Sequence, residues 1–185
     1  SGVNLIDFSD VVELTLAGVV GKVLHSTEDE ITVEAAASTP QEGDIKITCA
    51  TGYYVTLVDS FTYIAAGAID LVEPTSGQYG TKVKFTGISL FGGSDGLATV
   101  HLASFATEIL DESNEEVEVQ VIERGAKHLG DVVVVANSGA LTTASDAWTY
   151  VTEGVIGSVQ PDSGQIGTRV AVGGTNLLGG GSGIV

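Results

Sequence analysis

Basic residues are scarce in this sequence. Seven Lys and Arg stand against 24 Asp and Glu, which gives a formal net charge of -17 at pH 7. Nucleic-acid binding requires a basic surface, and anionic lipid attracts clusters of Lys and Arg, so both classes of partner are excluded. Copies of so acidic a chain repel one another, and salt or divalent cations relieve that repulsion.

Sulfur is almost absent. Cys49 is the single cysteine and there is no methionine. One cysteine forms neither an intrachain disulfide nor a cysteine metal cluster, so Cys49 is expected to be a small buried hydrophobe. The missing initiator indicates a processed or excerpted piece. Nothing resembles a signal peptide, and no apolar run is long enough to span a bilayer, so no membrane insertion is expected in this segment.

Catalytic signatures are also missing. The sequence shows no nucleophile-elbow motif or catalytic triad pattern, and its three histidines are not at metal-ligand spacing. The glycine-rich runs 92–96 and 179–183 contain no Lys, and an alternating strand pattern rather than a helix follows the first. We therefore expect no enzyme activity and no cofactor. No Asn-x-Ser/Thr sequon is present, although the many Ser and Thr leave O-linked glycan decoration open.

Acidic residues cluster in two equivalent hairpins. One interpretation is a weak divalent-cation site, because clustered carboxylates suit Ca²⁺. The alternative is a solvated turn whose charge protects a sheet edge from pairing. The candidate residues are Glu28, Asp29, Glu30, Asp111, Glu115 and Glu116.

One stretch of the chain occurs twice. Ala68–Gly93 returns without a gap as Val155–Gly180, with Pro74 matching Pro161. Tyr63 and Tyr150 stand 87 positions apart, as do Phe61 and Trp148. A fixed spacing of this kind predicts repeated structural modules with a period of about 87 residues.

Short alternating segments predict strands throughout. Val83 and Phe85, for example, share one face of a strand, while Lys82 and Lys84 share the other. We therefore expect an all-β protein of tandem β-sandwiches, with about seven strands in the middle module and no helix longer than a turn or two. The other strands are expected within 12–16, 31–33, 44–48, 59–63, 98–102, 117–121, 131–135 and 146–150.

The motif order resembles a known family. Residues 69–87 read Ile-x-x-Val-x-Pro-x-Ser-Gly-x-x-Gly-Thr-x-Val-x-Phe-x-Gly, and an acidic hairpin, Gly-Asp-Val-x-Val at 130–134 and Trp-x-Tyr at 148–150 follow. This pattern is similar to the IPT/TIG domain of plexins and certain transcription factors. The resemblance implies an immunoglobulin-like fold and tandem arrays in cell-surface or other extracellular proteins. The family also occurs in carbohydrate-active enzymes. The basic DNA-binding loops of its transcription factors are absent here.

The module boundaries suggest how the chain is organised. Residues 1–66 carry the later strands of a module, 67–154 a complete module, and 155–185 the opening hairpin of a further one. One hypothesis is that this hairpin completes the partial module of a neighbouring protomer, by strand complementation. The alternative is a longer covalent array in which each module is completed within the same chain. The expected contact residues are Ile156, Val159, Val170, Val172 and Leu177 on the hairpin, and Leu14 and Leu16 on the partial module.

These observations favour a structural function. We expect an extracellular or cell-surface repeat protein that builds a fibril, appendage or adhesive array, with copies of itself as partners. Two alternatives are a spacer in a ligand-binding receptor ectodomain and an accessory module of a secreted polysaccharide-active enzyme.

Overall fold

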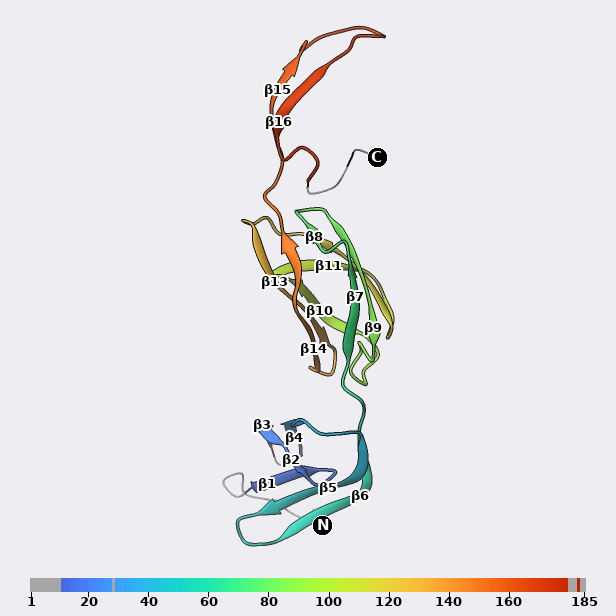
Figure 1. Ribbon diagram of the computed structural model, residues 1–185. Coiled ribbons are helices and arrows are strands. Elements are labelled where there is room, and N and C mark those ends of the chain that lie inside the picture. Colours follow the sequence, from blue (N-terminus) through green and yellow to red (C-terminus); the bar gives the residue numbers. More distant parts are fainter. Residues whose placement is uncertain (1–10, 28, 180–182, 184–185) are drawn as a thin grey trace. The chain divides into compact units, whose positions relative to one another are not determined.

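The computed structural model describes residues 11–27, 29–179 and 183 (Figure 1). All regular secondary structure in this part of the chain is β, as the alternating patterns predict. The described residues include no helix that could cross a membrane. The chain divides into two compact units, Ser1–Ala65 and Ala66–Val185.

The N-terminal unit contains two small sheets. The larger has the strand order β2-β1-β5-β6, and the smaller is the hairpin β3-β4. Leu14, Leu16 and Tyr63 are its buried hydrophobic centre, and Ile31 and Val33 of β4 are among the half-buried side chains that pack against them. The strands are β1 Val11–Leu16, β2 Val19–Val20, β3 Lys22–Ser26, β4 Ile31–Glu34, β5 Gln41–Cys49 and β6 Tyr54–Tyr63.

The second unit contains a complete sandwich. Eight strands follow the order β7-β9-β12-β11-β10-β13-β14-β8, and β11 joins the two layers because it pairs with both β10 and β12. The bounds are β7 Ala68–Glu73, β8 Ser76–Gly77, β9 Lys82–Ile88, β10 Leu97–Leu102, β11 Phe105–Glu112, β12 Glu116–Val121, β13 His128–Ala136 and β14 Leu141–Tyr150. This is the immunoglobulin-like sandwich that the sequence predicts.

The core of this sandwich lies between the two layers. Along β9 and β12, inward-facing residues alternate with outward-facing ones, and β9 buries Val83 and Phe85 completely. Trp148 and Tyr150 of β14 are the largest fully buried side chains. The core is continuous from β7 to β14, which makes this module self-sufficient in buried apolar surface.

Exposed ion pairs line the outer face of β9 and β12. The Lys84 ammonium lies 2.7 Å from the Glu116 carboxylate, and Lys82 lies 3.6 Å from Glu118. The hydrogen bond to Glu116 raises the pKa of Lys84 above its ordinary value. Because these groups are exposed, the pairs contribute little to stability.

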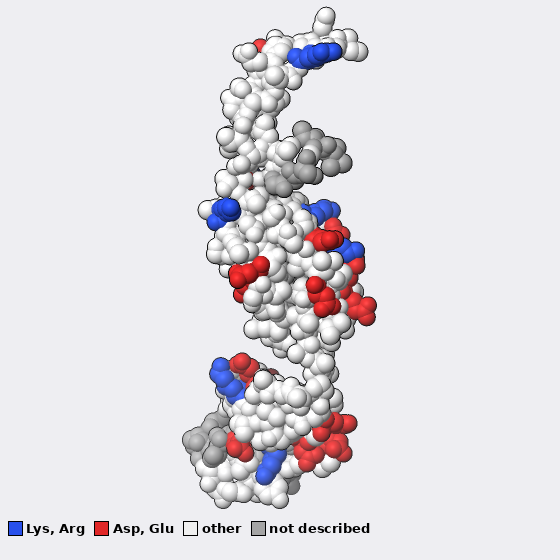
Figure 2. Space-filling model, in the orientation of Figure 1, with Lys and Arg blue, Asp and Glu red and all other residues white. Residues whose placement is uncertain are grey.

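The C-terminal hairpin forms a sheet of its own. Strands β15 (Val155–Gln160) and β16 (Ala171–Thr175) pair with each other and with no other strand of the described residues. The hairpin carries little charge, with Asp162 and Arg169 its only ionisable side chains between residues 155 and 179, and Figure 2 shows it almost uncoloured.

Candidate functional site

The hairpin β15-β16 reproduces the pairing of β7-β9 residue for residue. Ala68 pairs with Ile88 in the module, and Val155 pairs with Thr175 in the hairpin, each 87 positions later. The same correspondence holds for every pair in the two registers, including the irregularity that follows Ile69 in one and Ile156 in the other. The hairpin therefore has the strand register of a sandwich edge, although no other strand of the described residues pairs with it.

Burial distinguishes the two hairpins. Val83 and Phe85 of β9 are 0% exposed, whereas their counterparts Val170 and Val172 are 50% and 49% exposed. The remaining predicted donor residues, Ile156, Val159 and Leu177, are also exposed, although Leu90, the counterpart of Leu177, is buried in the module. The hairpin thus displays to solvent the apolar face that the complete module buries.

The tip of the hairpin is a defined turn. The Thr168 backbone N–H donates to the Gln165 carbonyl at 2.9 Å, and the Gln165 N–H donates to the Thr168 hydroxyl at 2.9 Å. Gly167 has φ +90°, which only glycine adopts readily and which a type II turn requires at its third residue. Gln78, Gly80 and Thr81 repeat this arrangement in the module, so the tip is held by its own hydrogen bonds.

The N-terminal unit offers the edge that such a hairpin fits. In the module, β12 pairs with β11 on one side and with β9 on the other. In the N-terminal unit, β4 corresponds to β12 and, among the described residues, pairs with β3 alone. Ile31 and Val33 of β4 occupy the places of Val117 and Val119, which pair with Phe85 and Val83.

A second open edge lies along β6. Its counterpart β14 pairs in parallel with β8, where the Thr149 N–H donates to the Thr75 carbonyl at 2.9 Å and the Val151 N–H donates to the Gly77 carbonyl at 2.7 Å. Within the described part of the chain, β6 pairs with β5 only. The described residues of the N-terminal unit therefore cover neither of the two edges that β7, β8 and β9 cover in the module.

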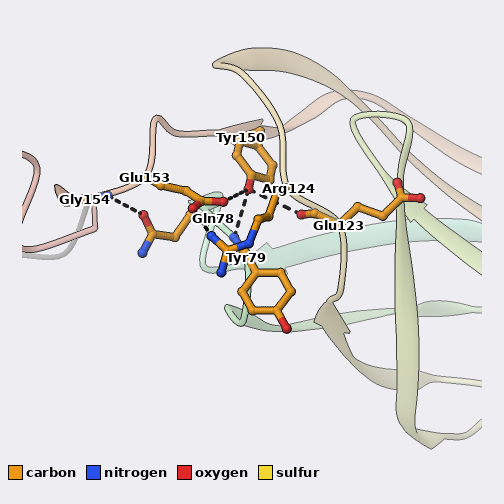
Figure 3. A network of polar contacts seen from close by, with 7 residues as sticks. All are labelled: Gln78, Tyr79, Glu123, Arg124, Tyr150, Glu153 and Gly154. Carbon is orange, nitrogen blue, oxygen red and sulfur yellow. Dashed lines mark hydrogen bonds and ion pairs between the residues drawn. The ribbon is translucent and has the colours of Figure 1, made fainter.

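A polar network closes the corresponding end of the module (Figure 3). The Tyr79 backbone N–H donates to the Tyr150 hydroxyl at 3.1 Å, and that hydroxyl lies within hydrogen-bond distance of the Glu123 carbonyl and the Glu153 carboxylate. Arg124 forms an ion pair with Glu153, and its guanidinium carbon lies 4.3 Å from the centre of the Tyr79 ring. These contacts connect the turn before β9 with the end of β14.

The sequence-predicted residues fall in different places. Leu14 and Leu16 lie in the buried centre of the N-terminal unit, and their contact with a donated hairpin stays a prediction. The apolar side chains of β4, at the edge itself, are Ile31 and Val33, which the sequence prediction of contact residues did not include. Aligning the two acidic hairpins in the sequence, with Glu30 at the place of Glu116, would have found them.

The acidic candidates form no evident cation site. Glu28 lies outside the described residues. Glu116 is paired with Lys84, and Asp29, Glu30, Asp111 and Glu115 lie at hairpin positions where, among the described residues, no group of three or more potential ligands could hold a metal ion. Their hydrogen bonds are those of turns, as in the Glu30 N–H that donates to the Thr27 hydroxyl at 3.1 Å. The cation-site hypothesis remains a prediction.

Comparison with known proteins supports the fold. No protein-family model and no curated protein matches the chain. Among solved structures, the chain is similar to the full extracellular region of plexin A4 (domains 1 to 10), at 20% identity and a TM-score of 0.50 over 93% of this chain and 16% of that one. At this identity, the likeness concerns an immunoglobulin-like, all-β architecture and nothing finer.

Two further structures have lower similarity. One is SGBP-B of the Bacteroides ovatus mixed-linkage glucan utilization locus, in complex with a mixed-linkage heptasaccharide, with 15% identity, a TM-score of 0.37, and coverage of 85% of this chain and 41% of that one. The other is gamma-CGTase from Alkalophilic bacillus clarkii, with 16% identity, a TM-score of 0.39, and coverage of 76% and 24%. The chain spans less than half the length of each of these structures.

Proposed function

We propose that this chain is a structural protein whose copies join head to tail into a fibril, appendage or adhesive array. The observation that carries the proposal is the hairpin β15-β16, which has the register of β7-β9 but leaves Val170 and Val172 exposed. The hairpin of one copy would add to the open edges of the N-terminal unit of the next, which is strand complementation. Ile31 would then lie opposite Val172, and Val33 opposite Val170.

Apolar burial supplies the driving force. Fully burying a large aliphatic side chain contributes about 1.5–3 kcal/mol, so five such side chains contribute roughly 7–15 kcal/mol as an upper bound. The side chains are Ile156, Val159, Val170, Val172 and Leu177. This sum is comparable to the net stability of a whole domain, about 5–15 kcal/mol, so the contact is strong enough to hold copies together.

The geometry of donation favours a polymer. Donor and acceptor surfaces are different parts of the chain, so the contact is heterologous and extends into a filament unless the rotation between copies closes a ring. Covering both open edges also removes a hazard, because unpaired strands promote aggregation. The same contacts would form within a longer covalent array, with a peptide bond joining the repeats.

The wider assignment belongs to the same proposal. We assign the chain to the IPT/TIG-like proteins on its motifs, and locate it outside the cell or at the cell surface, where that family forms arrays. We assign it no enzymatic role, and glycan decoration or divalent cations would be accessory. A receptor spacer or an accessory module of a polysaccharide-active enzyme would not form ordered polymers on its own, so electron microscopy distinguishes these functions.

Truncation tests the joint directly. The chain 1–154 keeps the complete module and lacks the donor hairpin, so we expect it to form no filaments under conditions in which the full chain does. Adding the peptide 155–185 to this truncated chain should yield capped monomers, observed as a monomeric mass with increased β content. Filaments of the truncated chain as abundant as those of the full chain would refute donation by the hairpin.

Ionic strength should control assembly. The net charge of -17 makes neighbouring copies repel each other, and the screening length falls from about 30 Å at 0.01 M salt to about 10 Å at 0.1 M. We therefore expect less polymer at 0.01 M than at physiological salt, measured by sedimentation. Equal polymer content at both salt concentrations would show that repulsion does not limit association.

A further inference from the structure

In the complete module, the Tyr150 hydroxyl forms a hydrogen bond with the opening hairpin. Tyr150 is fully buried, and its hydroxyl accepts a hydrogen bond from the backbone N–H of Tyr79. Tyr79 belongs to the turn that leads into β9, on the side of the sandwich that β7, β8 and β9 supply. A buried hydroxyl is stable only when it is hydrogen-bonded, so this contact couples the correct seating of the opening hairpin to the core.

Tyr63 is the equivalent of Tyr150 in the N-terminal unit, and within the described part of the chain its hydroxyl lacks the hydrogen bond that Tyr150 accepts. It stands 87 positions before Tyr150 at the end of β6, and only 9% of its surface is exposed. Its hydroxyl is buried and has no hydrogen-bond partner among the described residues. Trp148 Nε1 is likewise unpartnered there, but Phe61 stands at its place in the N-terminal unit, so it gives no information on the joint.

In the hairpin β15-β16, the residue equivalent to Tyr79 is Ile166. Ile166 stands 87 positions after Tyr79, at the equivalent place of the hairpin's turn, and it is fully exposed. The hydrogen bonds of the turn are made by Gln165 and Thr168, and the backbone N–H of Ile166 is not among them. It is therefore available to an acceptor outside the hairpin.

We propose that the buried Tyr63 hydroxyl accepts a hydrogen bond from the backbone N–H of Ile166 in a second copy of this chain, and that this bond fixes the register of donation. The inference rests on the proposed head-to-tail joint. A hairpin seated two residues out of register still buries apolar side chains, but it leaves the hydroxyl unpaired at a cost. The bond therefore selects one register among those that apolar contact alone permits.

The joint keeps this bond and omits the charges around it. In the module, the Tyr150 hydroxyl lies within hydrogen-bond distance of the Glu153 carboxylate, which forms an ion pair with Arg124. The corresponding places fall within Ala36–Ser38 of the N-terminal unit and at Ala66, where the second unit begins, and Ile166 stands at the place of Tyr79. The contact between copies is thus apolar around a single neutral hydrogen bond, which salt does not weaken.

Two substitutions in the full chain remove the two halves of the bond. Tyr63→Phe deletes the acceptor, and Ile166→Pro deletes the donor, because proline has no N–H and is favoured at the second position of such a turn. We expect each to raise the dissociation constant of the joint by about two- to tenfold, measured by sedimentation equilibrium. The double variant should be no weaker than the weaker single variant, because both remove the same bond.

Two controls separate this bond from general damage. Ile166→Ala keeps the N–H and should assemble close to the parent chain. In unassembled chain, Tyr63→Phe removes an unpaired buried hydroxyl and should raise the melting temperature of the N-terminal unit, whereas a purely structural role for Tyr63 would lower it. The register should also become heterogeneous in the filaments of Tyr63→Phe.

The outcomes distinguish the bond from the joint. If the chain forms no filaments and the hairpin peptide caps nothing, the proposed joint itself is wrong. If filaments depend on the hairpin but neither substitution weakens them, or if their effects add, the joint stands and the Tyr63 bond is overturned. A non-additive loss in both single variants supports the bond.

Discussion

Replacing Val170 and Val172 together by Asp is expected to abolish assembly of the full chain. In the proposed joint, both side chains occupy the positions at which Val83 and Phe85 are fully buried in the module. Burying a charged carboxylate without a partner costs several kcal/mol, so two of them exceed what the remaining apolar contacts supply. Sedimentation velocity should show monomer alone, at concentrations where the parent chain is polymeric.

A matched control places the same charges on the other face of the hairpin. Ser158 and Gln160 correspond to Leu71 and Glu73, which are exposed in the complete module. The double variant Ser158→Asp and Gln160→Asp therefore adds the same charge to the same hairpin, and it should still form filaments. Equal loss of assembly in both double variants would show that charge, rather than burial, governs the effect, and would contradict donation.

Much of the fold could be predicted because the sequence contains a repeat, whose two copies can be compared with each other. The alternation in residues 82–85 predicts β9, and the gapless repeat predicts that residues 155–175 form the same hairpin. Strand β11 was not predicted, because an irregularity between Ile109 and Asp111 interrupts the alternation of apolar and polar residues from which strands are recognised. Strand β3 escaped for the same reason, with its irregularity between Val23 and His25.

Only part of the candidate site could be predicted from the sequence. The apolar donor residues could be predicted because their counterparts in the module follow the core pattern. Tyr63 could not, since the sequence has tyrosine at both equivalent positions and gives no sign that one hydroxyl is bonded and the other is not. That difference depends on a turn from elsewhere in the chain, which local pattern cannot reveal.

Hydrogen exchange should detect the joint at two particular amides. Thr62 and Ile64 stand 87 positions before Thr149 and Val151, whose N–H groups donate to carbonyls of the segment around β8 in the module. In the joint, the Thr62 N–H would donate to the Asp162 carbonyl of the next copy, and the Ile64 N–H to the Gly164 carbonyl. We expect both to exchange rapidly in the monomeric Val170→Asp, Val172→Asp chain and slowly in filaments.

The size of this protection follows from the affinity of the joint. When the concentration of chain is about 100 times the dissociation constant, about one acceptor edge in ten is free, because donor and acceptor edges are equal in number, so exchange of these amides slows by up to about tenfold. The amides of Thr149 and Val151 are bonded within the module in either state, and they provide the internal control. Protection that stays equal in monomer and filament at Thr62 and Ile64 would place the contact between copies somewhere other than the edge of β6.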